Sequence, residues 1–261
     1  MRNHFACSIV AAAVLAFAPL LLAQQPVAAG SKPTPRTADG KPDLSGVWTW
    51  IVGSGPGGRR RFTFEEPPLQ PWAMEKFQAN RAGRKSPDDP APEQLNPSIF
   101  CFPSGVPKNM MGSVFPFEIF QSPNRILIFT EADNAVRQIR TDGRSHPAGF
   151  PAGYMGHSIG KWDGDTLVVD TIGRNDKTWI DIGGVPSSDA LHIVERMRRT
   201  DQDHLEIDFS FDDPKAFTKP WGAKRLYRLN PDLELVEQIA CEEYLKIGTF
   251  RVAHWPPEEG K

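Results

Sequence analysis

Beyond residue 29 the chain lacks any hydrophobic run of the roughly 18 residues that a membrane-spanning helix needs. The only long apolar stretch, Phe5 to Leu22, follows a short segment with one fixed positive charge at Arg2. Small residues come next, at Ala23 and again at Ala29. This order is typical of a secretory signal peptide, with an uncleaved membrane anchor as the alternative. We therefore expect residues 1–29 to be a signal peptide, and a soluble mature protein, periplasmic or secreted, without integral membrane contact.

The chain also lacks an excess of charge of one sign. Its 30 Lys and Arg residues are set against 32 Asp and Glu residues, for a formal net charge of −2. Binding to nucleic acid or to an anionic membrane surface draws on clustered positive charge. The composition therefore predicts neither partner.

Cysteine is scarce. Of the three cysteines, Cys7 lies in the signal peptide, which leaves Cys101 and Cys241. Two cysteines in an oxidising compartment predict one disulfide, and two buried free thiols are the alternative. The bond would close a loop of about 140 residues, worth roughly 5 kcal/mol in the chain-entropy model.

Spacings that hold metals or nucleotides are absent as well. The six histidines form no H-x-x-x-H or H-E-x-x-H pattern, and Asp163-x-Asp165 lacks the rest of a calcium loop. Gly53, Gly55 and Gly58 match a dinucleotide-binding pattern, but an extended segment follows where that motif needs a helix. We predict no metal and no cofactor, with a metal site assembled from distant strands as the open alternative.

What the chain does have is a period of two in its hydrophobic residues, interrupted by turn-forming residues. The segments with this pattern are 44–52, 114–121, 125–131, 135–141, 157–162, 166–172, 190–198, 205–211, 223–229 and 233–241. Asp163-Gly164 between two of them is typical of a tight hairpin. Many short strands joined by such turns predict a mainly β protein, an antiparallel, lipocalin- or calycin-like barrel of about 8–10 strands.

The remaining segments complete the expected domain organisation. Residues 30–43 are polar and predict an extended arm, and 44–261 form a single barrel domain. Pro71 to Ala82 predicts one helix near the N-terminal third, since proline suits the first turn and the apolar residues share a face. Residues 83–98 are rich in proline and predict a surface loop.

Glu195 stands out because it falls on an apolar face. In the segment 190–198, Leu191, Ile193 and Met197 alternate with polar residues, and Glu195 belongs to the apolar series. A carboxylate on a core face must be paired, protonated or exposed to a cavity. Two roles for Glu195 are therefore possible. It forms a structural pair with an Arg of a neighbouring strand, or it has a functional role.

Ser158 lies in Gly156-His157-Ser158-Ile159-Gly160, which matches the G-x-S-x-G nucleophile elbow. That motif needs a buried strand before the serine and a helix after it. Here a loop precedes the motif and a hairpin follows it. A serine hydrolase is therefore only the second alternative for function.

Gly46-Val47-Trp48 at the start of the first strand resembles the G-x-W signature of lipocalins and related calycin barrels. The resemblance implies that Trp48 closes the barrel floor. It also implies that an Arg from a late strand, Arg225 or Arg251, covers the indole by a cation–π contact.

A longer resemblance covers most of the mature chain. The matching segments are 38–48 (with DGKPDLSGVW), 141–147, 156–171 (GHSIGKWDGDTLVVDT) and 187–199 (SSDALHIVERMRR). These segments are similar to a family of exported proteins from environmental bacteria. The resemblance implies export and a β fold, and adds no particular chemistry.

Two function classes follow. The first is periplasmic binding of a small apolar or aromatic molecule inside the barrel, which about eight strands can enclose. The alternative is an enzyme, a lyase, isomerase or hydrolase, that applies acid–base chemistry to a small hydrophobic substrate in the same place. The candidate catalytic residues are His157, Asp170 and Glu195, and the candidate ligand-binding residues are Arg137, Arg144 and Trp162. A purely structural or interaction role is the third possibility, and no oligomeric state is predicted. Whether Glu195 and His157 face a common cavity separates these possibilities best.

Overall fold

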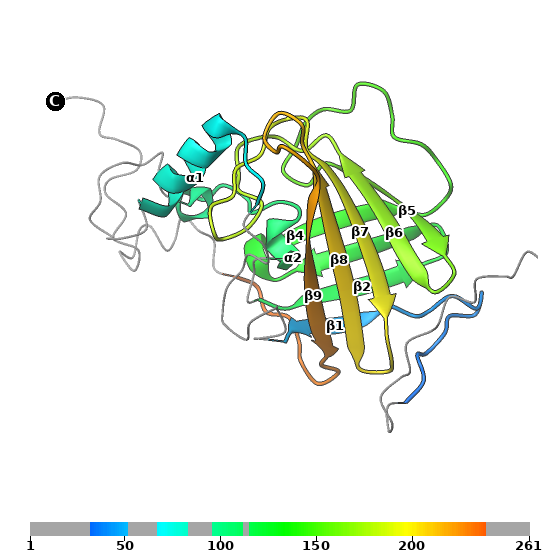
Figure 1. Cartoon of the computed structure of the whole chain (residues 1–261). Coiled ribbons are helices and arrows are strands. Elements are labelled where there is room, and N and C mark those ends of the chain that lie inside the picture. The colour runs from blue at the N-terminus through cyan, green and yellow to red at the C-terminus, as the bar shows by residue number, and fades with distance from the viewer. Residues whose placement is uncertain (1–31, 52–66, 83–95, 112–114, 239–261) are drawn as a thin grey trace, which may run out of the picture.

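In the computed structural model, nine strands form one closed barrel in which each strand pairs with the next and the last pairs with the first. The structure describes residues 32–51, 67–82, 96–111 and 115–238. The strands are β1 (Gly46–Trp50), β2 (Phe117–Ser122), β3 (Arg125–Thr130), β4 (Ala135–Arg140), β5 (His157–Asp163), β6 (Thr166–Ile172), β7 (His192–Arg199), β8 (His204–Asp212) and β9 (Trp221–Leu229). Figure 1 shows the long strands β7, β8 and β9 side by side along one wall. The predicted mainly β barrel is confirmed.

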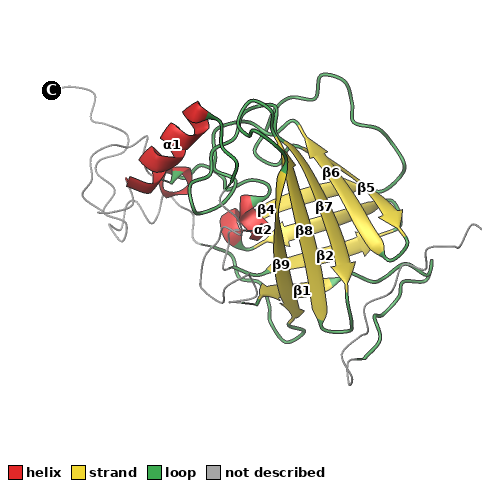
Figure 2. Ribbon diagram, in the orientation of Figure 1, coloured by secondary structure: helices red, strands yellow, loops and turns green. Residues whose placement is uncertain are grey.

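In the described parts of the chain, helices are few and lie at one end of the barrel (Figure 2). The longest is α1 (Pro71–Ala82), whose bounds agree with the predicted helix. The others are the four-residue α2 (Lys108–Met111) and the short 3-10 helices η2 (Pro97–Phe100) and η3 (Ala132–Asn134). Among the described residues, no helix is long and apolar enough to cross a membrane.

One predicted strand is wrong in its described part. The segment 233–241 continues the alternating pattern, yet residues 233–238 form no strand, and 239–241 lie outside the described residues. The physical reason is closure of the barrel. β9 already pairs with β8 on one side and with β1 on the other, so no sheet edge is left to receive another strand.

The barrel also differs from the prediction in one pairing. Eight of the nine strand pairs are antiparallel, but β4 and β5 run parallel. They pair over two positions only, Ile139 with Ser158 and Arg140 with Ile159. A parallel pair cannot be joined by a tight turn. Residues 141–156 therefore form a long excursion outside the barrel before β5 begins (Figure 1).

Protein side chains fill the end of the barrel where β9 begins. Met110 and Met111 of α2 are fully buried there. Arg225 Nε donates to the Met111 carbonyl (2.9 Å) and Tyr227 Oη donates to the Met110 carbonyl (3.2 Å), so β9 holds α2 in place. The helix thus acts as a plug made of the protein's own residues.

Trp48 closes the other end, where β7 finishes. The indole is fully buried and donates its Nε1–H to the Leu44 carbonyl (2.9 Å). The Arg that covers it, however, is Arg199 of β7, with its guanidinium carbon 5.1 Å from the ring centroid. Arg225 stacks on Trp50 instead, at 5.3 Å, and Arg251 lies outside the described residues. The predicted kind of contact is present, with a different arginine.

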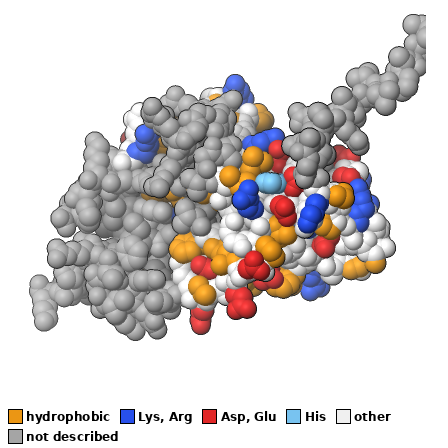
Figure 3. Space-filling view, turned by 90° about the horizontal axis from the view of Figure 1, so that it is seen from below, with side chains coloured by type: hydrophobic (Ala, Val, Ile, Leu, Met, Phe, Trp, Pro, Cys, Tyr) orange, Lys and Arg blue, Asp and Glu red, His pale blue; other side chains and the backbone are white. Residues whose placement is uncertain are grey.

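Charges of both signs alternate on the barrel wall. The face in Figure 3 carries acidic and basic side chains interspersed with hydrophobic ones. Exposed ion pairs link neighbouring strands, as between Lys224 and Asp208 (3.2 Å). Pairs of this kind contribute little to stability.

Candidate functional site

The strand alternation separates the predicted catalytic residues onto two faces of the sheet. On β5, Ser158 points into the barrel and is 3% exposed, whereas the preceding His157 lies on the outer face. On β6, the Asp170 side chain is outside and 40% exposed. Glu195 of β7 is inside, with no exposed area. His157 and Asp170 therefore share one site on the outer wall, and Glu195 does not face a common cavity with them.

Inside the barrel, Glu195 is paired with Arg137. Arg137 Nη1 donates to Glu195 Oε1 (2.9 Å), and Nη2 donates to Oε2. Arg137 also donates to the hydroxyls of Ser158 (3.2 Å from Nε) and Thr171 (3.0 Å from Nη2). The sequence suggested a pair between neighbouring strands. Arg137 is on β4, however, so the pair with Glu195 spans the inside of the barrel. All members are buried and hydrogen-bonded, which describes a structural network.

Ser158 does not have the setting of a nucleophile. It lies within β5, where its hydroxyl is within 2.9 Å of Thr171 Oγ1 as well as accepting from Arg137. The G-x-S-x-G residues enter a strand and not a sharp turn before a helix. The match to the elbow motif is thus a coincidence of sequence.

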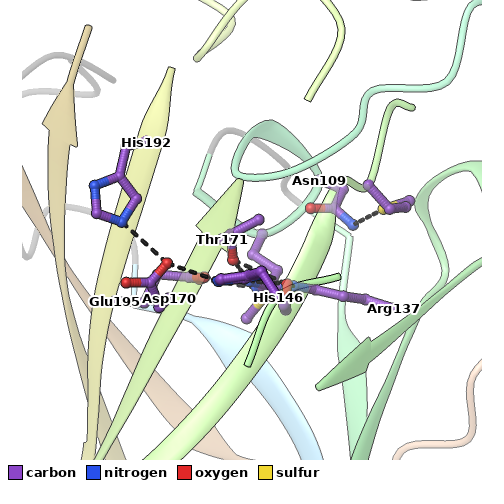
Figure 4. A network of polar contacts seen from close by, with 10 residues as sticks. Asn109, Arg137, His146, Asp170, Thr171, His192 and Glu195 are labelled. Carbon is purple, nitrogen blue, oxygen red and sulfur yellow. Dashed lines mark hydrogen bonds and ion pairs between the residues drawn. The ribbon is translucent and has the colours of Figure 1, made fainter. Parts of the chain in front are cut away.

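On the outer wall, two histidines that the sequence analysis did not single out join His157 and Asp170. His146 Nε2 and His192 Nε2 each lie 3.0 Å from Asp170 Oδ1, and Figure 4 shows both imidazoles directed at that carboxylate. On its other side, His146 Nδ1 lies 2.7 Å from His157 Nδ1. The four side chains form a continuous outer-wall relay, defined here as His192, Asp170, His146 and His157.

Local structure explains how the relay assembles. β5, β6 and β7 are adjacent, so His157, Asp170 and His192 come to one patch of the outer face through strand pairing. His146 comes from the 141–156 excursion, which folds back over this patch. The alternation in the segment 190–198 could have pointed to His192, because it places this side chain on the outward face of β7, next to β6. A loop has no periodicity, so nothing in the sequence placed His146.

The donor and acceptor rules fix the protons of the neutral relay. A carboxylate only accepts, so His146 Nε2 and His192 Nε2 carry hydrogens toward Asp170. A neutral His146 then presents an unprotonated Nδ1, which must accept from His157 Nδ1–H. The remaining His157 nitrogen, Nε2, is left without a proton.

The surroundings keep His157 neutral. Partial burial lowers the pKa of His157 below its ordinary value of 6.5, and electrostatic repulsion from the protonated form of His146, from Arg140 and from Arg144 lowers it further. The Phe150 ring packs against the imidazole with 4.8 Å between centroids, which contributes to this desolvation. At neutral pH His157 is an uncharged base in positively charged surroundings.

An open pocket of about 570 Å³ lies beside His157. The residues that line it are Asp142, Gly143, Arg144, Ser145, Pro147 and His157. Arg144 donates from Nη2 to Asp142 Oδ2 (2.6 Å), which holds the guanidinium at the pocket. The predicted ligand-binding residue Arg144 thus lies next to the predicted catalytic residue His157.

Other predicted site residues lie elsewhere. Trp162 is partly buried and packs against the barrel core, away from the relay. Among the described residues, no group of three or more His, Cys, Asp or Glu side chains is arranged to hold a metal ion. Cys241 lies outside the described residues, so the disulfide with Cys101 stays a prediction.

Comparisons with known proteins add no identity to this site. No protein-family model, no curated protein and no solved structure matched the chain.

Proposed function

We propose that the mature protein, exported to the periplasm or beyond, binds a small aromatic anion in the pocket on its outer wall. The observation that carries the proposal is the pocket between residues 142–147 and His157, which Arg144 lines, with Phe150 packed on the ring of His157 beside it. A β-barrel is compatible with ligand binding, and strands β5–β7 provide a rigid base for this site.

The side chains in and around the pocket support this ligand class. Arg140 and Arg144 place positive charge near His157, and their repulsion adds to the burial that lowers its pKa, while Asp142 in the lining is already paired with Arg144. A carboxylate would be attracted by the same charges. Phe150 is 37% exposed and offers an aromatic surface next to the imidazole. An aromatic ring with a carboxylate uses both features.

The outer pocket is favoured over the barrel interior that the sequence suggested. Met110 and Met111 enter the barrel from α2, and the Arg137–Glu195 pair crosses its middle. A ligand in the interior would have to displace these groups. A ligand in the outer pocket would displace no side chain of the barrel core.

The test is a titration of the full mature protein with benzoate, followed by NMR of the histidine ring signals. The expected result is a saturable shift of the His157 and His146 signals, with the His204 signal unchanged. His204 is a suitable internal control, because it pairs with Asp201 at the opposite end of the β7–β8 hairpin from His192. Arg144→Gln should weaken binding by about fivefold or more, equivalent to about 1 kcal/mol.

Two results would contradict the proposal. Shifts confined to the methyl signals of Met110 and Met111 would place the ligand inside the barrel. No saturable shift of any histidine up to the solubility limit of benzoate would remove this ligand class.

A further inference from the structure

We propose that the outer-wall relay is a proton-transfer site, with His157 Nε2 as general base and the pocket as the place where an aromatic keto acid is tautomerised. This inference rests on the proposed binding of an aromatic anion and adds a reaction to it. The residues that touch the substrate are His157 and Arg144, while His146 and Asp170 act as positioning residues.

The geometry assigns the base. His157 Nδ1 is engaged by His146 at 2.7 Å, so Nε2 is the nitrogen left for a ligand in the pocket that His157 lines. Among the hydrogen bonds of the described residues, none involves this nitrogen. A base must lie within hydrogen-bond reach of the proton that it removes, and His157 lines the pocket in which the ligand would bind.

The rest of the relay stabilises the protonated base. When His157 takes up a proton, its Nδ1–H still donates to His146, and His146 still donates to Asp170 at 3.0 Å. The carboxylate thereby faces the new positive charge through one imidazole. His192 donates to the same Asp170 oxygen and holds the carboxylate in place. A carboxylate that orients an imidazole in this way supports general-base catalysis in other protein folds.

The proposed reaction is a tautomerisation, which needs no reactant other than the substrate and a base. In the enol form of an aromatic keto acid, His157 Nε2 accepts the enol O–H proton as the carbonyl forms. The protonated His157 then returns a proton to the adjacent carbon. Atoms and charges balance, the product is the keto form, and the base is regenerated.

Arg144 has a defined place in this reaction. Its side chain is 51% exposed and lies at the pocket beside His157. It would hold the substrate carboxylate and favour the negative charge that develops on oxygen as the proton leaves. Asp142 already orients it, and a bound substrate carboxylate would share the guanidinium with Asp142.

The experiment follows the conversion of phenylpyruvate enol to the keto form by ultraviolet absorbance, with wild-type protein, His157→Gln, His146→Gln and the control His204→Gln. Wild type and His204→Gln should accelerate the conversion equally. His157→Gln should lose about 100-fold or more of the catalysed rate, the typical contribution of a positioned base. If His157→Gln does not fold, wild type saturated with benzoate serves the same purpose and should lose the acceleration.

His146→Gln tests the positioning role through the split between kcat and KM. His146 holds His157 in the tautomer that leaves Nε2 unprotonated, and it links the protonated base to Asp170. The variant should lose about tenfold or more of kcat, while KM stays within about twofold because His146 does not touch the substrate. An unchanged kcat, or a KM that rises as much as kcat falls, would contradict the positioning role.

Failure of this inference can be told apart from failure of the binding proposal. If benzoate shifts the His157 signal but wild type does not accelerate the conversion, binding stands and proton transfer is wrong. The same holds if His157→Gln is as fast as wild type. If benzoate does not bind and the conversion is not accelerated, both proposals are wrong.

Discussion

Arg137 on β4 and Glu195 on β7 form a bidentate ion pair inside the barrel, with β5 and β6 between their strands. Their side chains are 1% and 0% exposed. This pair explains why a carboxylate occupies the apolar face of β7. Of the three residues predicted to be catalytic, Glu195 therefore belongs to the core, whereas His157 and Asp170 lie on the outer wall.

Glu195→Gln should destabilise the protein strongly. The change leaves the buried Arg137 charge without its partner, which costs about 3–5 kcal/mol. Urea unfolding measures the loss. Asp163→Asn is the matched control, since it removes an exposed ion pair with Arg196 (2.9 Å) and should cost less than about 1 kcal/mol.

A double variant separates charge from packing. Arg137→Met combined with Glu195→Leu removes both charges and should recover most of the stability lost in Glu195→Gln. An unchanged stability of Glu195→Gln would show that the pair is not a structural element.

Ser158 should not react with a fluorophosphonate probe. Its hydroxyl is buried and hydrogen-bonded to Arg137 and Thr171. Ser158→Ala should instead lower stability by about 1–3 kcal/mol, because Arg137 loses an acceptor in a buried place. Any activity of the folded protein should stay within a few fold. Mass-spectrometric labelling at Ser158 would overturn this interpretation.

Asp181, between β6 and β7, should make stability depend on pH. Its side chain is fully buried, and burial raises its pKa to about 6, although hydrogen bonds from backbone N–H groups, including Val185 N (3.2 Å), oppose the shift. Because the folded pKa lies above the ordinary 3.8, the folded state keeps this proton to higher pH than the unfolded chain. Stability from this group is therefore lost as pH rises from about 4 to above 6.

Asp181→Asn removes that dependence. Relative to wild type, its unfolding free energy should rise by about 2 kcal/mol between pH 4 and pH 7.5, since most of the difference between the two pKa values is lost over this range. Denaturant unfolding at both pH values gives the difference. The exposed Asp212→Asn is the control and should track wild type. A parallel course of Asp181→Asn and wild type would contradict the raised pKa.

Export and the disulfide remain predictions with a direct measurement. Mass spectrometry of protein recovered from the periplasm should show an N-terminus near Gln24 or Gly30. Alkylation without reduction should leave both Cys101 and Cys241 unmodified. Two alkylated cysteines would exclude the disulfide, and an intact Met1 would exclude cleavage.

Local sequence was enough to predict the nine strands of the barrel, apart from their exact bounds, and the face on which their alternating side chains lie, although the tenth predicted strand was wrong in its described part. A period of two is a local property, so Ile193, Glu195 and Met197 were placed together on the inner face of β7, where all three are buried. The helix Pro71–Ala82 was likewise predicted from its own residues alone. Closure of the barrel followed from the number of strands and the turns between them.

The tertiary structure decided which of these side chains meet. Alternation places a residue inside or outside, but the partner depends on which strands are neighbours and how loops return. Arg137 reaches Glu195 across two strands, and Arg199 instead of Arg225 covers Trp48, because curvature of the closed barrel brings these groups together. His146 reaches Asp170 through an excursion that the parallel pairing of β4 and β5 requires. Local periodicity has no information on such distant contacts, and the candidate site is made of them.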